Sequence, residues 1–389
     1  MPDIHEDNIS FSVLIPDGES SFVLSVLQCL GKVKNVKIYV LSNEPWGRIR
    51  FSRYINHFFS YPKEEGDERR LVAINDIVKK KKIDIILPVE QQAIRLFSRN
   101  SETLSKLTSI VHLPKTEAFD IARNKWWLAE WLKKNHIPSP PTVLYQSNVK
   151  FEETLSTLSF PVLLKPIFGS GGNGIKYFEN ASALNRYCKE RPYSNKFIVQ
   201  SYINGYDISC SLLCRNGQIL AHTIQKRVTD EALNFRPTTD IDFYYDSCTY
   251  NVVKEVVDKL NWDGIVNFDL RYDEQDKQVK VIEMNPRYWG SLLGSLSAGV
   301  NFPYLACLSG LSHDFPEMSA NPIRFVHGKT TIRHLVRGFF HKNKSTQYYD
   351  KSNLEYSFRD PFPAVIAIYL YVYKQIKKKI AAVPKTFHA

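Results

Sequence analysis

Three side chains with hard oxygen atoms lie on two apolar segments in the second half of the sequence: Asp269, Glu283 and Asn285. The segments 266–271 (VNFDLR) and 278–285 (QVKVIEMN) are predicted to be paired strands joined by the polar stretch 273–277. Residues two apart on a strand share a face, so we expect Asp269 to lie across from Glu283 and Asn285. This set suits Mg²⁺ that leaves room for nucleotide phosphates. The alternative is that these side chains face solvent.

A glycine-rich stretch, 168–174 (FGSGGNG), follows a predicted strand at 160–166 that carries Lys165. A plain hairpin needs one or two glycines, and the excess suits a mobile lid whose backbone N–H groups close over phosphate oxygens. The stretch is not a Walker P-loop, because no Gly-Lys-Ser/Thr follows. A second lysine, Lys125, lies at the start of a predicted helix, 123–135.

The elements that must position these residues begin with strands alternating with helices. Strands are predicted at 11–15, 36–41, 84–89 and 109–113, and helices at 21–30 and 71–80. This alternation indicates a parallel α/β sheet covered on both faces. Glu90 follows one strand, where we expect a structural or capping role. Gly18 belongs to no GxGxxG, so no dinucleotide site is predicted.

In the middle of the chain, the sequence predicts a helix followed by antiparallel strands. In the helix 123–135 a core face is predicted for Trp127, Leu128, Trp131 and Leu132, with Lys125 off that face. A strand is predicted at 196–203, and the runs 208–213 and 218–224 form a hairpin turned at Asn216-Gly217. Cys210 and Cys214 are interpreted as buried thiols, and His222 as a packed histidine.

The polar stretch 226–246 lies between these strands and the predicted metal strands. Its Arg227 and Arg236 are candidates to hold an anionic substrate or the γ-phosphate. The alternative for both is an exposed surface charge.

Composition narrows the class of protein. The 389 residues carry a net charge of +11, but residues 321–389 alone hold 13 Lys/Arg against 3 Asp/Glu. The excess is therefore a property of the C-terminal segment, and nucleic-acid binding is not expected. The six cysteines match no zinc spacing, and the acidic start is unlike a signal peptide, so a reduced, cytoplasmic compartment is expected.

The C-terminal segment holds an apolar run, 362–373, followed by the lysine-rich 374–379. The run is too short to span a bilayer, which needs about 20 apolar residues. Two interpretations stay open: a helix packed on the protein body, or peripheral membrane contact through residues 362–380.

The order of these motifs resembles the ATP-grasp superfamily of carboxylate–amine ligases. It runs from Lys125 through VLLKP (162–166), the glycine loop and QSYINGYD (200–207) to FDLR (268–271) and IEMNPR (282–287). The resemblance covers about residues 1–310, and its nearest characterised branches look D-aspartate-ligase-like or carbamoyl-phosphate-synthase-like. It implies an α/β fold with a parallel pre-ATP-grasp domain (1–115), a linker helix and lid (116–205), an antiparallel metal subdomain (206–320) and a basic extension (321–389).

The resemblance also implies roles for individual residues. Asp269, Glu283 and Asn285 would hold Mg²⁺, with Mn²⁺ as an alternative, and Arg287 would stabilise the transferred phosphoryl group. The nucleotide would contact Lys125, Lys165, the lid residues Gly169, Ser170, Gly171, Gly172 and Gly174, the adenine residues Gln200, Tyr202 and Ile203, and the ribose residue Asp207. The family often has glutamate where Gln200 and Asp207 stand, which puts those two contacts in doubt.

The implied reaction activates a carboxylate with ATP as an acyl phosphate and joins it to an amine, releasing ADP and phosphate. The expected substrates are small molecules, with precursors of cell-surface polysaccharide or envelope, made at the inner face of the membrane, as one class. One alternative is bicarbonate activation of the carbamoyl-phosphate-synthase type. Another is a membrane-attached nucleotide-binding module without ligase activity. The substrates and the oligomeric state are not predicted.

Overall fold

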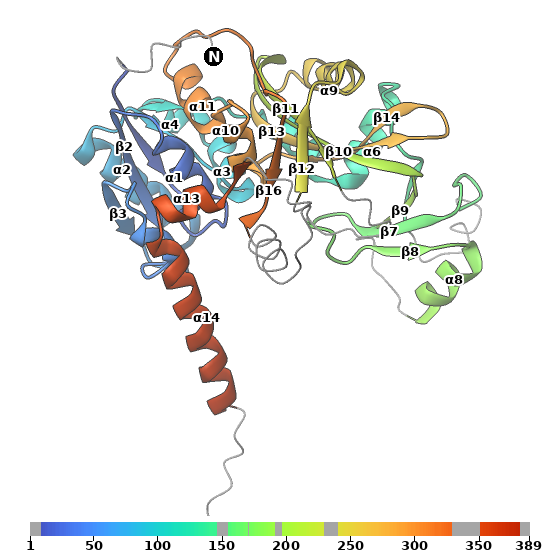
Figure 1. The fold of residues 1–389 in the computed structure, drawn as a ribbon, viewed down its shortest axis with the longest axis horizontal. Helices are drawn as coiled ribbons and strands as arrows, with labels where there is room; N and C mark the ends of the chain where they lie inside the picture. The colour runs from blue at the N-terminus through green and yellow to red at the C-terminus, as the bar shows by residue number, and fades with distance from the viewer. Residues whose placement is uncertain are drawn as a thin grey trace, which may run out of the picture.

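The computed structural model describes residues 9–145, 155–169, 171–190, 197–228, 240–328 and 351–381. They form three sheets with helices on their faces, and one helix that extends outward (Figure 1). The predicted mixed α/β fold is confirmed: one sheet is parallel, one is antiparallel, and the third is antiparallel except for two short strands.

The N-terminal sheet has the order β3-β2-β1-β4-β5, and every neighbouring pair in it is parallel. Its strands are β1 Phe11–Ile15, β2 Val36–Ser42, β3 His57–Ser60, β4 Ile85–Ile86 and β5 Ser109–Ile110. The helices of this part are α1 Val23–Leu30, α2 Gly66–Lys81, α3 Gln91–Arg99 and α4 Ser101–Leu104, with the short 3₁₀ helix η2 at Arg48–Phe51. The chain crosses over between β1 and β4, so the loops after these two strands meet at the carboxyl edge where such sheets bind ligands.

The second sheet contains four strands in the order β6-β9-β7-β8. The strands are β6 Thr142–Leu144, β7 Val162–Pro166, β8 Lys176–Phe178 and β9 Phe197–Ser201, and the helix α8 Ala181–Glu190 lies beside them. This lid sheet has its own small core, which includes Val162, Leu164 and Leu184. It carries the glycine loop between β7 and β8.

The third sheet is central and runs β14-β13-β10-β11-β12-β16-β17, with β15 paired to β11. Its strands are β10 Gly205–Arg215, β11 Gln218–Arg227, β12 Asp240–Tyr244, β13 Gly264–Asp273, β14 Gln278–Asn285, β15 Met318–Ser319, β16 Ile323–Val326 and β17 Lys351–Ser352. The predicted hairpin is confirmed: Asn216 (φ 50°) and Gly217 (φ 76°) turn β10 into β11 with the positive φ values of a type I′ turn.

One face of the central sheet is apolar and packs on the helices α5 Thr116–Arg123, α6 Lys125–Lys134 and α9 Ser247–Lys259. Cys210 and Cys214 are buried on this face, as expected. The remaining helices are α10 Leu292–Ser297, α11 Phe302–Gly310, α13 Leu354–Arg359 and α14 Phe362–Ala381, and α10 and α11 share a core with the N-terminal sheet. On the opposite face, Leu213, Ala221 and Ile265 join the core shared with α10, α11 and the N-terminal sheet, and the rest of that face carries polar groups.

The predicted core face of the 123–135 helix is partly wrong. Leu128 and Leu132 are buried, but Trp127 is 52% exposed. Lys125 lies three residues before Leu128, which places it on the buried face rather than off it. Trp131 is half-buried and packs against the core as predicted, so Trp127 alone of the four is misplaced, because the helix packs along the line through positions 125, 128 and 132.

Candidate active site

The register of two strands brings the predicted metal residues together. On β13 and β14, Asp269 lies directly across from Glu283, and Asn285 lies across from Asn267. The Asn285 amide nitrogen donates to Asp269 Oδ2 at 3.1 Å. The site therefore has two carboxylates and two amides on one sheet face, rather than carboxylates spread toward solvent.

The sequence analysis missed Asn267, which stands two residues before Asp269 and so shares its face. The hydroxyls of Ser209 and Ser211 donate to Asn267 Oδ1 at 3.0 and 2.9 Å. Its own amide nitrogen lies 3.3 Å from Asp269 Oδ1. The alternation that identified Glu283 and Asn285 on β14 applies equally to this pair and would have found it.

Burial controls the electrostatics of this cluster. Loss of solvent and, second to it, the neighbouring Glu283 carboxylate together raise the pKa of Asp269 to about 7. Asp269 and Glu283 face each other, so ionising both carboxyl groups costs a large free energy unless a cation lies between them. Among the described residues no group of three or more His, Cys, Asp or Glu gathers, so amide oxygens must complete any cation site. Hard oxygen donors of this kind fit Mg²⁺.

Lys125 links the lid to the carboxylates. Its ammonium donates to Gly169 O at 2.8 Å and to Glu283 Oε1 at 3.1 Å. The side chain of Asn124 caps the helix by accepting from Trp126 N and Trp127 N, which fixes Lys125 at the first turn. This buried lysine thus connects the glycine loop to the metal strands.

Lys165 is buried in the lid sheet. Its ammonium donates to Gln200 Oε1 at 2.6 Å, and Gln200 in turn donates to Thr142 Oγ1 at 2.8 Å. Desolvation lowers the pKa of Lys165 to about 8. The Gln200 oxygen has a second lone pair, so it keeps the capacity to accept from an adenine amino group.

The glycine loop has the backbone that its composition predicts. Gly169, Gly171, Gly172 and Gly174 all have positive φ values, between 68° and 132°. At Gly174 a Cβ atom would lie 2.9 Å from Pro166 Cγ, so a larger residue would strain the turn. Ser170 lies outside the described residues. The loop is therefore built from conformations that glycine reaches without cost.

Arg271 organises the segment that follows β9, and the sequence analysis overlooked it. Its guanidinium donates to Ile203 O at 2.7 Å, Gly205 O at 2.6 Å and Tyr202 Oη at 2.9 Å. It also pairs with the half-exposed carboxylate of Asp207. Any ribose contact by Asp207 must therefore share its oxygens with Arg271.

Arg287 lies between the metal strands and the N-terminal sheet. Its guanidinium is 4.7 Å from the Phe22 ring, and Nη2 lies 3.4 Å from Asn285 Oδ1. Its Nε is 3.8 Å from the carboxylate of Glu90, which caps α3 by accepting from Gln91 N. The capping role expected for Glu90 is confirmed, and its contact with Arg287 adds a link between two sheets.

Buried Asp17 holds the backbone beside Glu90. Its carboxylate accepts from Glu90 N at 2.7 Å and from Val89 N at 3.1 and 3.2 Å. Val89 O accepts from Tyr288 N at 3.3 Å. Asp17, at the crossover of the N-terminal sheet, therefore fixes the loop against which Arg287 and Tyr288 lie.

Arg227 ends β11, and Arg236 lies outside the described residues. Gln225, two residues before Arg227, pairs with Ser209, which pairs in turn with Asp269. Arg227 consequently shares the sheet face of the metal residues and is half-buried. His222 is packed as expected, with Nδ1 3.0 Å from Glu317 Oε1.

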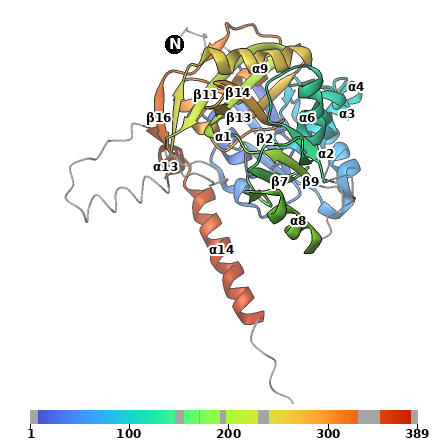
Figure 2. The same ribbon diagram turned by 90° about the vertical axis from the view of Figure 1, so that its right-hand side faces the viewer.

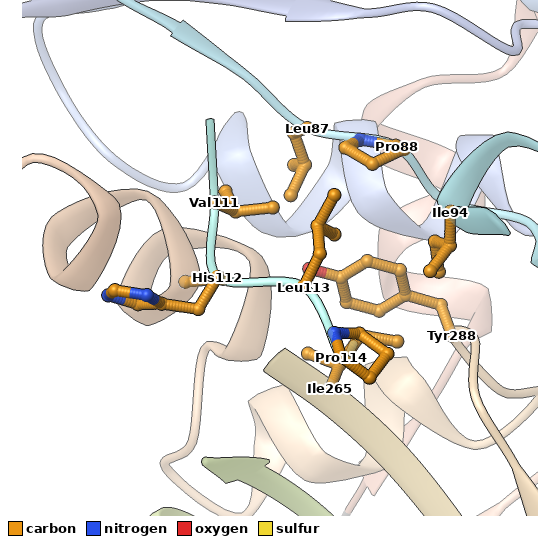
Figure 3. A pocket seen from close by; sticks show the side chains of 10 residues that line it. Leu87, Pro88, Ile94, Val111, His112, Leu113, Pro114, Ile265 and Tyr288 are labelled. Atoms are coloured by element: carbon orange, nitrogen blue, oxygen red, sulfur yellow. The ribbon is translucent and has the colours of Figure 1, made fainter. Parts of the chain in front are cut away.

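A cavity near the site is too small for a substrate. It lies between the N-terminal sheet and β13, among apolar residues that include Leu87, Val111, Ile265 and Tyr288 (Figure 3). Its volume of about 10 Å³ is close to that of one water molecule. Burial raises the pKa of Tyr288, whose hydroxyl has no partner among the described residues. The cavity separates two packed layers, and the chemistry belongs to the polar sheet face instead.

Comparison with known proteins agrees with this geometry. Residues 122–291 match the family described as ATP-grasp domain. Over 181 residues the chain is 24% identical to the carbamoyl phosphate synthase large chain of Archaeoglobus fulgidus, a match that covers 44% of this chain and 17% of that protein. The chain thus spans about a sixth of the length of the curated relatives it matches.

Solved structures share the fold over most of the chain. L-amino acid ligase from Bacillus licheniformis matches with a TM-score of 0.57 and 17% identity, covering 78% of this chain and 74% of that one. N5-carboxyaminoimidazole synthetase from Staphylococcus aureus, complexed with ADP, matches with a TM-score of 0.62 and 17% identity, covering 81% and 82%. The segment that matches the ATP-grasp domain, residues 122–291, includes the glycine loop, β13, β14 and Arg287.

Proposed function

We propose that the protein is an ATP- and Mg²⁺-dependent ligase that joins a carboxylate to an amine. The observation that carries the proposal is the position of Lys125, whose ammonium contacts both the lid carbonyl of Gly169 and the carboxylate of Glu283. A nucleotide under the lid would therefore have its phosphates next to the metal strands. Asp269, Glu283 and Asn285 would hold Mg²⁺, which neutralises phosphate charge when bound.

The reaction proceeds in two displacements. A carboxylate oxygen forms a bond to the γ-phosphorus of ATP, and ADP leaves with the electrons of the bond that breaks. The amine nitrogen then bonds to the acyl carbon, phosphate leaves with its electron pair, and the nitrogen loses a proton. Lys125, Lys165 and Arg287 stabilise the transferring phosphoryl group without proton transfer, and the glycine lid excludes water from the acyl phosphate.

The remaining predicted residues would bind the nucleoside and the substrate. Gln200 and the backbone of Tyr202 and Ile203 would contact adenine, and Asp207 would contact ribose while paired with Arg271. Arg227 lies on the same sheet face as Asp269 and would bind an anionic substrate or the γ-phosphate. Arg236 is proposed for the same role on sequence grounds alone.

Bicarbonate is the second candidate for the activated carboxylate. The similarity to the carbamoyl phosphate synthase large chain favours it. The fold shared with an L-amino acid ligase is compatible with an amino-acid substrate. We further propose a cytoplasmic enzyme that acts on a cell-surface or envelope precursor, supported by six free cysteines and the basic extension.

The test is a screen for ADP release over amino acids, sugar acids and bicarbonate, with and without amines. With a productive carboxylate and Mg²⁺ but no amine, hydroxylamine should trap the acyl phosphate as a hydroxamate. ATP cleavage that needs only bicarbonate would select the second candidate. Formation of AMP and pyrophosphate would overturn the acyl-phosphate mechanism. If the protein binds ATP but cleaves it with none of these substrates, it would instead be a nucleotide-binding module without ligase activity.

A further inference from the structure

Helix α14 extends away from the rest of the described chain in both views (Figures 1 and 2). Its contacts with the body are mainly to η2, near its first turn. Large apolar or aromatic side chains are exposed along it: Phe362, Val365, Ile368, Tyr369, Tyr371, Val372 and Tyr373. At 100° per residue these positions cover about 200° of the helix circumference. A helix that packs on a protein body needs a stripe only about half as wide.

The root of this helix is firmly attached. Asp360, which is buried, accepts from Ser52 Oγ at 2.6 Å and from Arg53 N at 3.0 Å. In the preceding helix α13, the buried Tyr356 has its hydroxyl 2.9 Å from Ser297 Oγ. The exposed position of α14 therefore results from a packed joint on the N-terminal part of the molecule.

Aromatic and cationic groups also gather beside the root. Trp46 is 71% exposed, and the Arg50 guanidinium lies 5.0 Å from its ring. Phe358 in α13 is 79% exposed. Arg48 and Arg50 belong to η2, and the far end of α14 holds lysines at positions 374, 377, 378 and 379. Positive charge thus stands at both ends of an apolar helix.

We propose that α14 and Trp46 form a docking surface for an anionic lipid bilayer. Tyrosine and tryptophan side chains favour the headgroup region, and arginine and lysine are attracted to anionic headgroups. The apolar part, Phe362 to Tyr373, is about 18 Å long as a helix, short of the ~30 Å hydrocarbon core. No helix among the described residues is long and apolar enough to cross a membrane. The helix therefore inserts into one leaflet or lies in the interface.

A second copy of the chain is a poorer occupant of this surface. Pairing two such helices buries one stripe on each and leaves the rest of the 200° arc in water. A parallel pair would also bring together two lysine-rich ends, which repel. A lipid surface covers the arc without this repulsion, and the excess of 13 Lys/Arg over 3 Asp/Glu in residues 321–389 complements anionic lipid.

Flotation of the full chain with vesicles tests the proposal. Vesicles of phosphatidylcholine with phosphatidylglycerol should carry the protein at low salt, and high salt or pure phosphatidylcholine should release it. The double variant Ile368→Glu/Tyr371→Glu should lower the partition coefficient at least about tenfold, because two carboxylates would have to leave water. Ligase activity is assayed without vesicles, so failure of one proposal leaves the other intact.

A matched pair of tryptophan variants tests the second part of the surface. Trp46→Ala should weaken flotation and remove the quenching of fluorescence by brominated phosphatidylcholine, whereas Trp127→Ala, an exposed tryptophan on α6, should change neither. Failure of the wild-type chain to float with anionic vesicles at low salt would overturn the proposal. So would a dimer in sedimentation that only the α14 double variant dissociates, with no vesicle binding.

Discussion

Asp269 and Glu283 face each other across β13 and β14, and their charges are tolerable only with a cation nearby. Exchange of Glu283 for Gln, or of Asn285 for Ala, should therefore lower turnover at least about a hundredfold, as loss of a group stabilising transition-state charge does. ADP release measures the loss. Unchanged circular dichroism and unfolding midpoints serve as the control, and ADP release at the wild-type rate from both variants would remove the metal assignment.

The lowered pKa of Lys165 predicts that the protein takes up protons when it binds a nucleotide. Burial lowers the pKa of its ammonium to about 8, so in the free protein at that pH about half of the lysines are neutral. Nucleotide phosphates favour the charged form, and binding should take up as much as about half a proton at pH 8. Calorimetry in buffers of different ionisation enthalpy measures this uptake.

The controls for this measurement use arginine at each lysine in turn. Lys165→Arg should bind without proton uptake, because guanidinium stays charged at pH 8. Lys125→Arg should keep the uptake, since Lys165 is intact. Equal uptake by the wild type and Lys165→Arg would assign the proton to another group.

At the scale of elements, Asp17 joins the ends of β1 and β4. Burial raises the pKa of Asp17 from near 4 to about 7, so the folded state binds more protons than the unfolded state between these values. The free energy of unfolding must then fall as pH rises through this window. In Asp17→Asn the slope should become shallower by up to about 1.4 kcal/mol per pH unit, and Asp269 should supply what remains.

Urea unfolding at a series of pH values measures these slopes. Identical slopes in the two proteins would show that Asp17 titrates alike in the folded and unfolded states.

Local pattern predicted the elements whose signal is local. The Asn216-Gly217 turn follows from the φ values those residues reach, and the opposition of Asp269 and Glu283 follows from strand alternation across a short connection. Helix α9 also carried a readable signal that the sequence analysis did not use, with Asp246 as its cap and buried valines at helical spacing.

Contacts between segments that are far apart in the chain could not be predicted from the sequence. Arg287 meets Glu90, and Arg271 meets Ile203, across separations that no periodicity spans. Trp127 was misplaced because an aromatic side chain suggests burial, whereas its position on the helix decides the matter. Sequence alone therefore predicted the fold class and the pairing of β13 with β14, but not the contacts that join distant segments.

At the scale of the whole molecule, we expect that the stability of the fold does not depend on α14, the helix proposed to contact the membrane. A chain that ends at Pro361 should keep its unfolding temperature within about 2 °C, because most of the described side chains that it loses are exposed and only Pro363 is buried. Asp360→Ala should cost about 1–3 kcal/mol, because it leaves Ser52 and the Arg53 amide without their acceptor. Thermal unfolding compares the two, and a larger loss from the truncation would mean that α14 packs on the body.

The contact between Lys125 and Glu283 has a thermodynamic consequence. In this structure the lysine neutralises the carboxylate that the ion would need. Phosphates that draw Lys125 toward themselves release Glu283, so nucleotide should raise the affinity of the protein for Mg²⁺. Coupling between two equilibria is reciprocal, and Mg²⁺ must raise nucleotide affinity by the same factor. Exchange of Lys125 for Met should reduce that coupling factor toward the value set by the direct attraction of ion and phosphate.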